Sequence, residues 1–253
     1  MPKPRILIYD IETSANLAWV WGTWQQNVIQ FEKEWRILCV TWKWFGEKGI
    51  SYCGQDSFKT YYKQNPECDL KVVEKLHELF DQADVLIAHN GDTFDKKKTN
   101  ARFLFHGMEP PSPYKTIDTL KIARSKFKFN SNKLTDLGKT LGFGEKVNTG
   151  GFALWAGCMN GCPKAWAKMQ RYAKGDVKLL EKLYKKLLPW IDNHPNYGLY
   201  LDSEVPVCTN CGKNTLIKRG YSYAQTQVYQ RYQCTSCTKY SKSTKSIKSV
   251  GVK

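Results

Sequence analysis

The sequence predicts a mixed α/β domain followed by a small cysteine-rich module, and three observations lead to this expectation. Short apolar runs typical of strands come first and then alternate with segments of helical periodicity, as in a mixed sheet flanked by helices. From about Asn193 the composition changes, and cysteine pairs appear among basic residues. The length of 253 residues suits one sizeable domain with an appendage of this kind.

The first part of the chain supplies the expected strands. Residues 5–11 form an apolar run that ends in acids, which favours a buried central strand. Two more strands are expected at 35–45 and 49–54, because a turn-like Gly-Glu-Lys segment separates them. The run at 84–90 opens into a loop as a parallel strand does, and 114–119 has the character of a further short strand.

Four segments carry apolar residues at helical spacing and are expected to form the flanking helices. The last of them is the longest, and proline is well placed in its first turn and just beyond its end. The four segments are 70–82, 96–106, 133–141 and 163–188.

We therefore expect four consecutive parts along the chain. Residues 1–192 form the α/β domain, and 193–207, which are rich in turn-forming residues, form a linker. Residues 208–240 form the cysteine-rich module. The Ser- and Lys-rich stretch at 241–253 is of low complexity, so we expect it to be a basic, disordered tail.

The formal net charge of +16 at pH 7 exceeds what solubility requires and favours a polyanionic partner, with a merely basic surface as the alternative. The N-terminal region has no long apolar segment, so we expect no membrane association and a cytoplasmic location, in the host if a phage encodes the protein. In that reducing compartment the nine cysteines should be free thiols or metal ligands.

Three short motifs place acids where an α/β protein binds its ligands. Asp10 and Glu12 end the first expected strand, and residues two apart on a strand point to the same face. The segment His89–Asp95 follows an apolar run at the carboxyl end of an expected strand, where such sheets hold ligands. Tyr172 and Asp176 stand four apart in the last expected helix and share one face. Acids often end strands at the surface, so each motif alone is weak, but the three together indicate one site.

In this order the motifs D-x-E, N-x-x-x-F-D and Y-x-x-x-D resemble those of the DEDD exonuclease superfamily, in its tyrosine-containing subgroup. The chain is similar to the proofreading exonuclease domains of family-B DNA polymerases and to small phage and bacterial exonucleases. The resemblance implies a ribonuclease-H-like fold, four metal-binding acids and a tyrosine that positions the attacking water. Matched residue by residue, these are Asp10, Glu12, Asp95, Asp176 and Tyr172. Asp92 is the rival for the acid of the second motif, but the adjacent Phe94 favours Asp95.

The chemistry of the expected reaction explains this set of residues. Phosphodiester hydrolysis needs a hydroxide at neutral pH and stabilisation of the leaving oxygen, which two ions about 3.5–4 Å apart supply. Mg²⁺ and Mn²⁺ prefer carboxylates and water, so we expect two of either ion in the active site. A tyrosine ordinarily has a pKa of about 10, so Tyr172 is expected to orient the water rather than deprotonate it.

Several residues near these motifs are candidates for contact with the substrate. Asn90 and Phe94 of the second motif are expected to hold the substrate end, and for Asn90 the alternative is a cap on the following helix or turn. Three tryptophans after the first motif could stack on the terminal bases of a single strand, or pack against the sheet instead. They are Trp19, Trp21 and Trp24.

Two C-x-x-C pairs in the last part of the chain match the ligand spacing of a structural zinc site. The four ligands are Cys208, Cys211, Cys234 and Cys237. The residues between the pairs have the pattern of a hairpin, so the arrangement resembles a zinc ribbon. Tyrosines alternate there with Lys and Arg, which suits contact with nucleic acid, and a protein-docking module is the alternative. Cys158 and Cys162 lack obvious partners and are expected to be free thiols.

The sequence therefore predicts a monomeric, metal-dependent 3′→5′ exonuclease that acts on DNA, with preference for single-stranded 3′ ends, and carries a zinc ribbon. Trimming of RNA and structure-specific endonuclease activity on the same fold are alternatives within the enzymes. A nucleic-acid-binding or recruiting protein with an idle active site is the alternative from another class.

Overall fold

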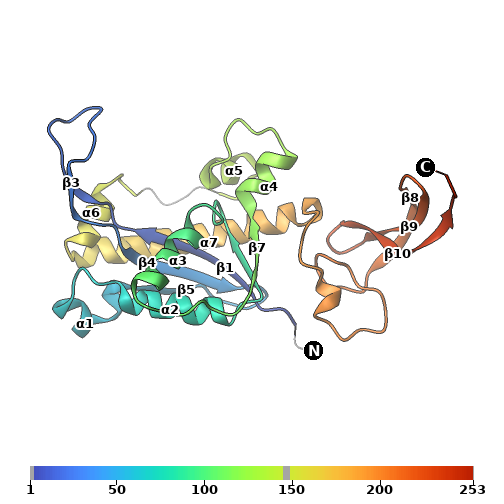
Figure 1. The fold of residues 1–253 in the computed structure, drawn as a ribbon, viewed down its shortest axis with the longest axis horizontal. Coiled ribbons are helices and arrows are strands. Elements are labelled where there is room, and N and C mark those ends of the chain that lie inside the picture. The colour runs from blue at the N-terminus through green and yellow to red at the C-terminus, as the bar shows by residue number, and fades with distance from the viewer. Residues whose placement is uncertain (1–2, 145–148, 253) are drawn as a thin grey trace. The chain divides into compact units, whose positions relative to one another are not determined.

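The computed structural model describes residues 3–144 and 149–252 and contains a five-stranded mixed sheet. Strand β1 is antiparallel to β4 and parallel to β6, β4 pairs antiparallel with β5, and β6 pairs in parallel with β7. In sheet order the strands are β5 (Ser51–Gly54), β4 (Ile37–Trp44), β1 (Ile6–Thr13), β6 (Val85–Ala88) and β7 (Lys115–Asp118). Figure 1 shows this sheet among its helices, and the predicted mixed α/β fold is confirmed.

Strand β1 lies at the centre of the sheet because it is apolar on both faces. Leu7, Tyr9 and Ile11 belong to a buried cluster that includes the apolar residues of helix α2 (Leu70–Asp81). On β4, Leu38 belongs to a second cluster with helices α6 (Ala153–Met159) and α7 (Pro163–Leu187). Alternation along β1 therefore directs Asp10 and Glu12 away from the α2 cluster.

The four helices expected from apolar periodicity are present, with ends that differ by at most one residue from the expected ones. They are α2, α3 (Asp95–Phe105), α5 (Leu134–Thr140) and α7. Three further helices were not expected: α1 (Lys59–Gln64), α4 (Thr119–Lys126) and α6. Each has only six to eight residues, too few for a convincing helical period. Short 3₁₀ segments occur at Gln55–Ser57, Leu188–Trp190 and Tyr197–Leu199.

A two-stranded hairpin follows β1 and was also not expected. Its strands are β2 (Leu17–Trp19) and β3 (Gln30–Lys33), and Figure 1 shows it extending away from the five-stranded sheet. The side chains of Trp21 and Trp24 at its tip are 90% and 83% exposed. The alternative that Trp21 and Trp24 pack against the sheet is therefore wrong.

The C-terminal part contains a separate three-stranded antiparallel sheet in the order β10-β9-β8. Strands β8 (Leu216–Tyr223) and β9 (Gln227–Cys234) are the expected hairpin, whereas β10 (Tyr240–Ser249) lies where a disordered tail was expected. The prediction that residues 241–249 are disordered is therefore wrong. Pairing with β9 satisfies the backbone of this polar segment, and Lys242 Nζ lies 4.4 Å from the ring centre of Tyr229.

Contacts between Cα atoms divide the chain into two compact units. One consists of Arg5–Lys121 and Phe129–Leu183 and contains the five-stranded sheet. The other consists of Met1–Pro4, Ile122–Lys128 and Tyr184–Lys253. The four-part division into 1–192, 193–207, 208–240 and 241–253 stays a prediction, except that the disorder of the last part is corrected above. Within the described ranges, no helix is both long and apolar enough to cross a membrane.

Candidate functional site

Three carboxylates converge on one side of β1. Asp10 and Glu12 stand two apart on that strand, and Tyr9 and Ile11, the neighbours of Asp10, are buried in the α2 cluster. Asp176 is 4% exposed and comes from α7. Carboxylate oxygens of these three acids all lie within 4.8 Å of one another. Negatively charged carboxylates this close repel one another unless a cation lies between them. The cluster therefore fits a site for a hard divalent ion such as Mg²⁺ or Mn²⁺.

Tyr172 lies one helical turn before Asp176 and forms a hydrogen bond with it. Burial, together with the charges of Asp176 and Glu12, raises the pKa of Tyr172 far above its usual range. The phenol therefore keeps its proton at neutral pH. Its hydroxyl lies at the edge of the acid cluster, where it is hydrogen-bonded to Asp176.

Asp95 lies beside this cluster rather than within it. The side chain is 3% exposed, and its Oδ1 accepts a hydrogen bond of 3.1 Å from the backbone N–H of Ile11, between Asp10 and Glu12. Burial raises the pKa of Asp95 to about 7. Asp95 therefore lies against the strand that carries Asp10 and Glu12, but it is not one of the three acids whose oxygens converge.

The rival acid, Asp92, has a different environment. Its carboxylate forms ion pairs with Lys96 at 3.0 Å and with Lys121 at 2.7 Å. Burial acts in the opposite direction, but the hydrogen bonds from Lys121 and Lys96 lower the pKa of Asp92 to about 2. Two lysines therefore already neutralise this acid, which leaves Asp95 as the stronger candidate for metal binding.

Asn90 builds the turn between β6 and α3. Its φ is 71°, its Oδ1 accepts a hydrogen bond of 2.6 Å from Thr93 Oγ1, and its backbone N–H donates to Asp118 at 2.9 Å. The Asn90 side chain thus contacts Thr93 within the turn, but it does not cap α3, whose N-cap residue is Phe94. Phe94 is 38% exposed at the start of α3, and Lys98 Nζ lies 5.3 Å from its ring centre. Contact of either residue with a substrate stays a prediction, as it does for the hairpin tryptophans.

Trp155 is a site residue that the sequence motifs do not include. Its Nε1–H donates a hydrogen bond of 3.1 Å to Oε2 of Glu12. Its ring meets that of Tyr172 edge to face, with centroids 5.9 Å apart. No sequence signal could have found it, because α6 is short and lies between the second and third motifs.

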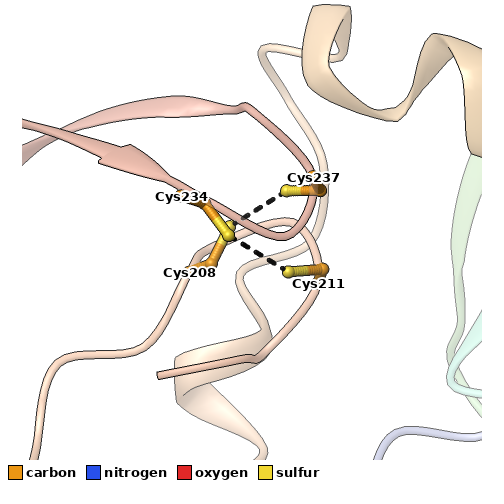
Figure 2. A group of neighbouring side chains, drawn as sticks. All are labelled: Cys208, Cys211, Cys234 and Cys237. Atoms are coloured by element: carbon orange, nitrogen blue, oxygen red, sulfur yellow. Dashed lines mark hydrogen bonds between the residues drawn. The ribbon is translucent and has the colours of Figure 1, made fainter. Parts of the chain in front are cut away.

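The second candidate metal site is the group formed by the four cysteines of the two C-x-x-C pairs. Their sulfur atoms lie within 4.8 Å of one another, and Figure 2 shows the side chains converging from two turns. Two of the sulfur–sulfur distances are 3.5 Å, from Cys208 to Cys237, and 3.7 Å, from Cys211 to Cys234. Sulfurs about 2.3 Å from a tetrahedral zinc stand about 3.8 Å apart, so this group fits a zinc ion.

The two cysteine turns have the same backbone pattern. In the first, the N–H of Gly212 donates to the C=O of Cys208, and in the second the N–H of Thr238 donates to the C=O of Cys234, both at 2.9 Å. Gly212 and Thr238 both have positive φ, at 70° and 61°. Each turn thus holds its own pair of cysteines with local backbone contacts.

Cys158 and Cys162 belong to neither group. Cys158 is buried beside α7 in the second core cluster, and Cys162 is exposed. Within the part of the chain that the structure describes, the acid cluster and the four-cysteine group are the only sets of three or more potential metal-binding side chains. The expectation of free thiols is consistent with this placement.

Comparison with known proteins agrees with the fold. A family model described as the RNase_H superfamily matches residues 48–188, more than half of the chain, so the chain belongs to this superfamily. The match begins after Asp10 and Glu12. These two acids are placed in the site by the structure, where they converge with Asp176. No curated protein matches the chain in sequence.

Among solved structures, the family B DNA polymerase from the hyperthermophilic archaeon Pyrobaculum calidifontis is similar, with a TM-score of 0.54 and 13% sequence identity. The match covers 89% of this chain and 32% of that polymerase, so the chain corresponds to about a third of the polymerase's length. At this identity the likeness concerns the fold.

Proposed function

We propose that the protein is a divalent-metal-dependent 3′→5′ exonuclease of the tyrosine-containing DEDD subgroup. The observation that carries the proposal is the convergence of Asp10, Glu12 and Asp176 on an RNase H-like sheet, with Tyr172 one turn away. The similarity in fold to a family B DNA polymerase supports it. Substrate class and direction of hydrolysis belong to this proposal.

Each residue of the cluster has a part in the proposed mechanism. Two divalent ions would supply an activated water and stabilise charge on the leaving oxygen. Asp10, Glu12 and Asp176 would hold them, with Asp95 as the fourth ligand. Tyr172, whose hydroxyl is hydrogen-bonded to Asp176, would orient the attacking water through that hydroxyl.

The charge distribution on α7 supports nucleic acid as the partner. Basic side chains recur along this helix at every third or fourth position, a spacing that places them on one face. They are Lys164, Lys168, Arg171, Lys174, Lys178 and Lys182. The acids of the helix are Asp176 and Glu181, and Glu181 pairs with Lys43 at 2.7 Å. A basic row along the helix that carries Tyr172 and Asp176 would attract a phosphate backbone toward the site.

The hairpin β2–β3 offers a different kind of contact. Trp19, Trp21 and Trp24 are exposed, and residues 14–31 contain neither Lys nor Arg. We propose that these indoles, with Phe94, stack on bases of a single strand, which is worth about 1–3 kcal/mol per base. Because no charge is involved, this contribution should vary little with salt.

For the C-terminal module we propose a zinc ribbon that adds affinity for nucleic acid. Tyr221 and Tyr223 are exposed on β8, and the neighbouring Lys218 and Arg219 are exposed as well. Aromatic and basic side chains together suit a single strand. Docking of another protein is the alternative. A monomeric state and a cytoplasmic location complete the proposal.

The test is digestion of 5′-labelled single-stranded DNA and RNA of one sequence, with Mg²⁺, with Mn²⁺ and with chelator. We expect a metal-dependent ladder of progressively shorter 5′-labelled DNA. RNA products alone would indicate RNA trimming, and internal cuts in structured DNA would indicate an endonuclease. Binding without hydrolysis in either metal would show that the active site is idle. The Asp176→Asn protein, prepared in parallel, controls for contaminating nucleases.

A further inference from the structure

Trp155 contacts two residues of the candidate active site from an element outside the three motifs. The indole N–H donates to Oε2 of Glu12 at 3.1 Å, and the ring lies edge to face against Tyr172. Since an indole nitrogen can only donate, this hydrogen bond holds one of the two oxygens of Glu12 in place. Glu12 and Tyr172 are thus held by the same side chain.

The position of Trp155 is set by packing. Its neighbours on α6, Leu154 and Cys158, are 4% and 0% exposed and lie in a cluster with Trp166 and Met169 of α7. At Gly157, a Cβ atom would stand 2.7 Å from the Cβ of Ala165, so α6 approaches the start of α7 more closely than a larger residue would permit. The indole therefore comes from a rigid support.

We propose that Trp155 is a positioning residue that makes the acid cluster selective for small divalent ions. This inference rests on the proposed metal-dependent function. Mg²⁺ binds one carboxylate oxygen at about 2.0–2.1 Å, whereas the larger Ca²⁺ often takes both oxygens of a carboxylate at about 2.3–2.6 Å. An ion that chelates both oxygens of Glu12 would share Oε2 with the indole N–H, whose hydrogen bond makes that oxygen a weaker ligand. An ion bound to a single oxygen leaves that hydrogen bond intact.

The test compares Trp155→Phe with the wild type as full-length, zinc-loaded chains. Phenylalanine keeps an aromatic ring near Tyr172 and removes the N–H. Calorimetric titration with Mn²⁺, Mg²⁺ and Ca²⁺ should show about 10-fold weaker binding of Mg²⁺ and Mn²⁺, as for other groups that orient metal ligands. The affinity for Ca²⁺ should stay constant or rise, so the preference for Mg²⁺ over Ca²⁺ should fall about 10-fold. In hydrolysis, kcat should fall while KM for the oligonucleotide stays constant.

Two further variants separate positioning from packing. Trp166→Phe removes an indole from the same core cluster, so it should change stability but leave the preference between ions unchanged. Trp155→His restores a ring N–H donor and should recover part of the preference that Trp155→Phe loses; if Trp155→Phe does not fold, Trp155→Met, which also lacks an N–H, replaces it in the comparison.

An unchanged ratio of Mg²⁺ to Ca²⁺ affinity in Trp155→Phe, in a background where the wild type hydrolyses DNA, would overturn this inference alone. A wild-type protein that neither binds these ions nor hydrolyses nucleic acid would instead overturn the proposed function.

Discussion

The two candidate metal sites of this protein are assembled in opposite ways. The four cysteines come as two local turns with the same backbone hydrogen bonds, and the turns belong to one compact unit. The carboxylates come from β1 and α7, which lie far apart in the sequence and meet only across the folded sheet. The difference suggests that metal holds the cysteine module together, whereas the sheet holds the acids together whether or not a metal is bound.

The largest effect should follow loss of the cysteine site. Structural zinc contributes about 10–16 kcal/mol of apparent binding energy in small zinc domains. We therefore expect Cys208→Ser to abolish zinc binding and to make residues 208–249 sensitive to protease. Hydrolysis of a short oligonucleotide should continue, while the salt dependence of binding to longer strands should flatten. Metal analysis, limited proteolysis and binding at several salt concentrations provide the measurements.

Cys162→Ser is the matched control, because Cys162 is exposed and belongs to neither cluster. It should behave like the wild type in all three measurements. If the salt dependence were equal in Cys208→Ser and the wild type, the ribbon would not bind nucleic acid, and protein docking would be favoured.

Substitutions in the acid cluster should have the opposite effect: activity should be lost, and the fold should be kept. Asp176→Asn removes one charge from three crowded carboxylates, so the melting temperature should stay constant or rise. Hydrolysis should fall about 1000-fold, because stabilisation by metal ions is worth several kcal/mol and each 1.4 kcal/mol is a factor of ten. Thermal unfolding and initial rates with Mg²⁺ test both statements.

The choice between Asp95 and Asp92 is tested in the same assay. Asp95→Asn should lose hydrolysis as Asp176→Asn does, whereas Asp92→Asn, which disrupts only the pairing with Lys96 and Lys121, should keep most of it. Activity that survives in Asp95→Asn and is lost in Asp92→Asn would show that Asp92 is the ligand.

A smaller effect is expected from Tyr172→Phe, which keeps the ring against Trp155 and removes only the hydroxyl. Loss of one orienting hydrogen bond should lower kcat about 10-fold, with unchanged zinc content and an unchanged melting temperature. Single-turnover rates provide the measurement. An undiminished rate would remove Tyr172 from the mechanism and confine the acid cluster's chemistry to its carboxylates.

The smallest effect concerns the two cysteine turns. Thr238 has a φ of 61° where its counterpart Gly212 has 70°, and a residue other than glycine in this region is strained by about 1 kcal/mol. Thr238→Gly should therefore strengthen zinc binding slightly, by about fivefold at most. Gly212→Ala is the opposing control, because its Cβ would stand 2.7 Å from Cδ1 of Tyr197. Weaker zinc binding by Thr238→Gly would contradict the equivalence of the two turns.

The C-terminal strand shows where sequence patterns fall short. Serine and lysine dominate 241–249, so composition predicts disorder, yet these residues form β10. The segment buries little apolar surface, and its structure depends on backbone pairing with β9 and on the contact of Lys242 with Tyr229. Pairing with a neighbouring strand leaves no signal in the segment's own composition.

The contacts that attach the cysteine module to the preceding segment could not be predicted from the sequence either. Nδ2 of Asn210 donates to the backbone carbonyls of Leu188 and Ile191 at 2.8 and 2.9 Å, and Lys239 Nζ donates to Ile191 at 2.9 Å. Asn210 is 2% exposed, so its loss would remove one buried donor from each of these two carbonyls of the chain after α7. A turn-rich composition after residue 192 predicts a linker and contains no sign of these contacts.

By itself, the sequence determined the mixed α/β class, the long helices and the residues of the two candidate metal sites, apart from Asp95, which lies beside the acid cluster. Apolar periodicity reflects burial, and ligand chemistry depends on residue type and spacing, so both are local properties of the chain. Only the tertiary structure decided that Asp92 is neutralised by two lysines, that Asp95 lies against the backbone of β1, and that Trp155 holds Glu12. These are contacts between segments distant in sequence, which form only when the sheet and helices pack, so no local pattern records them.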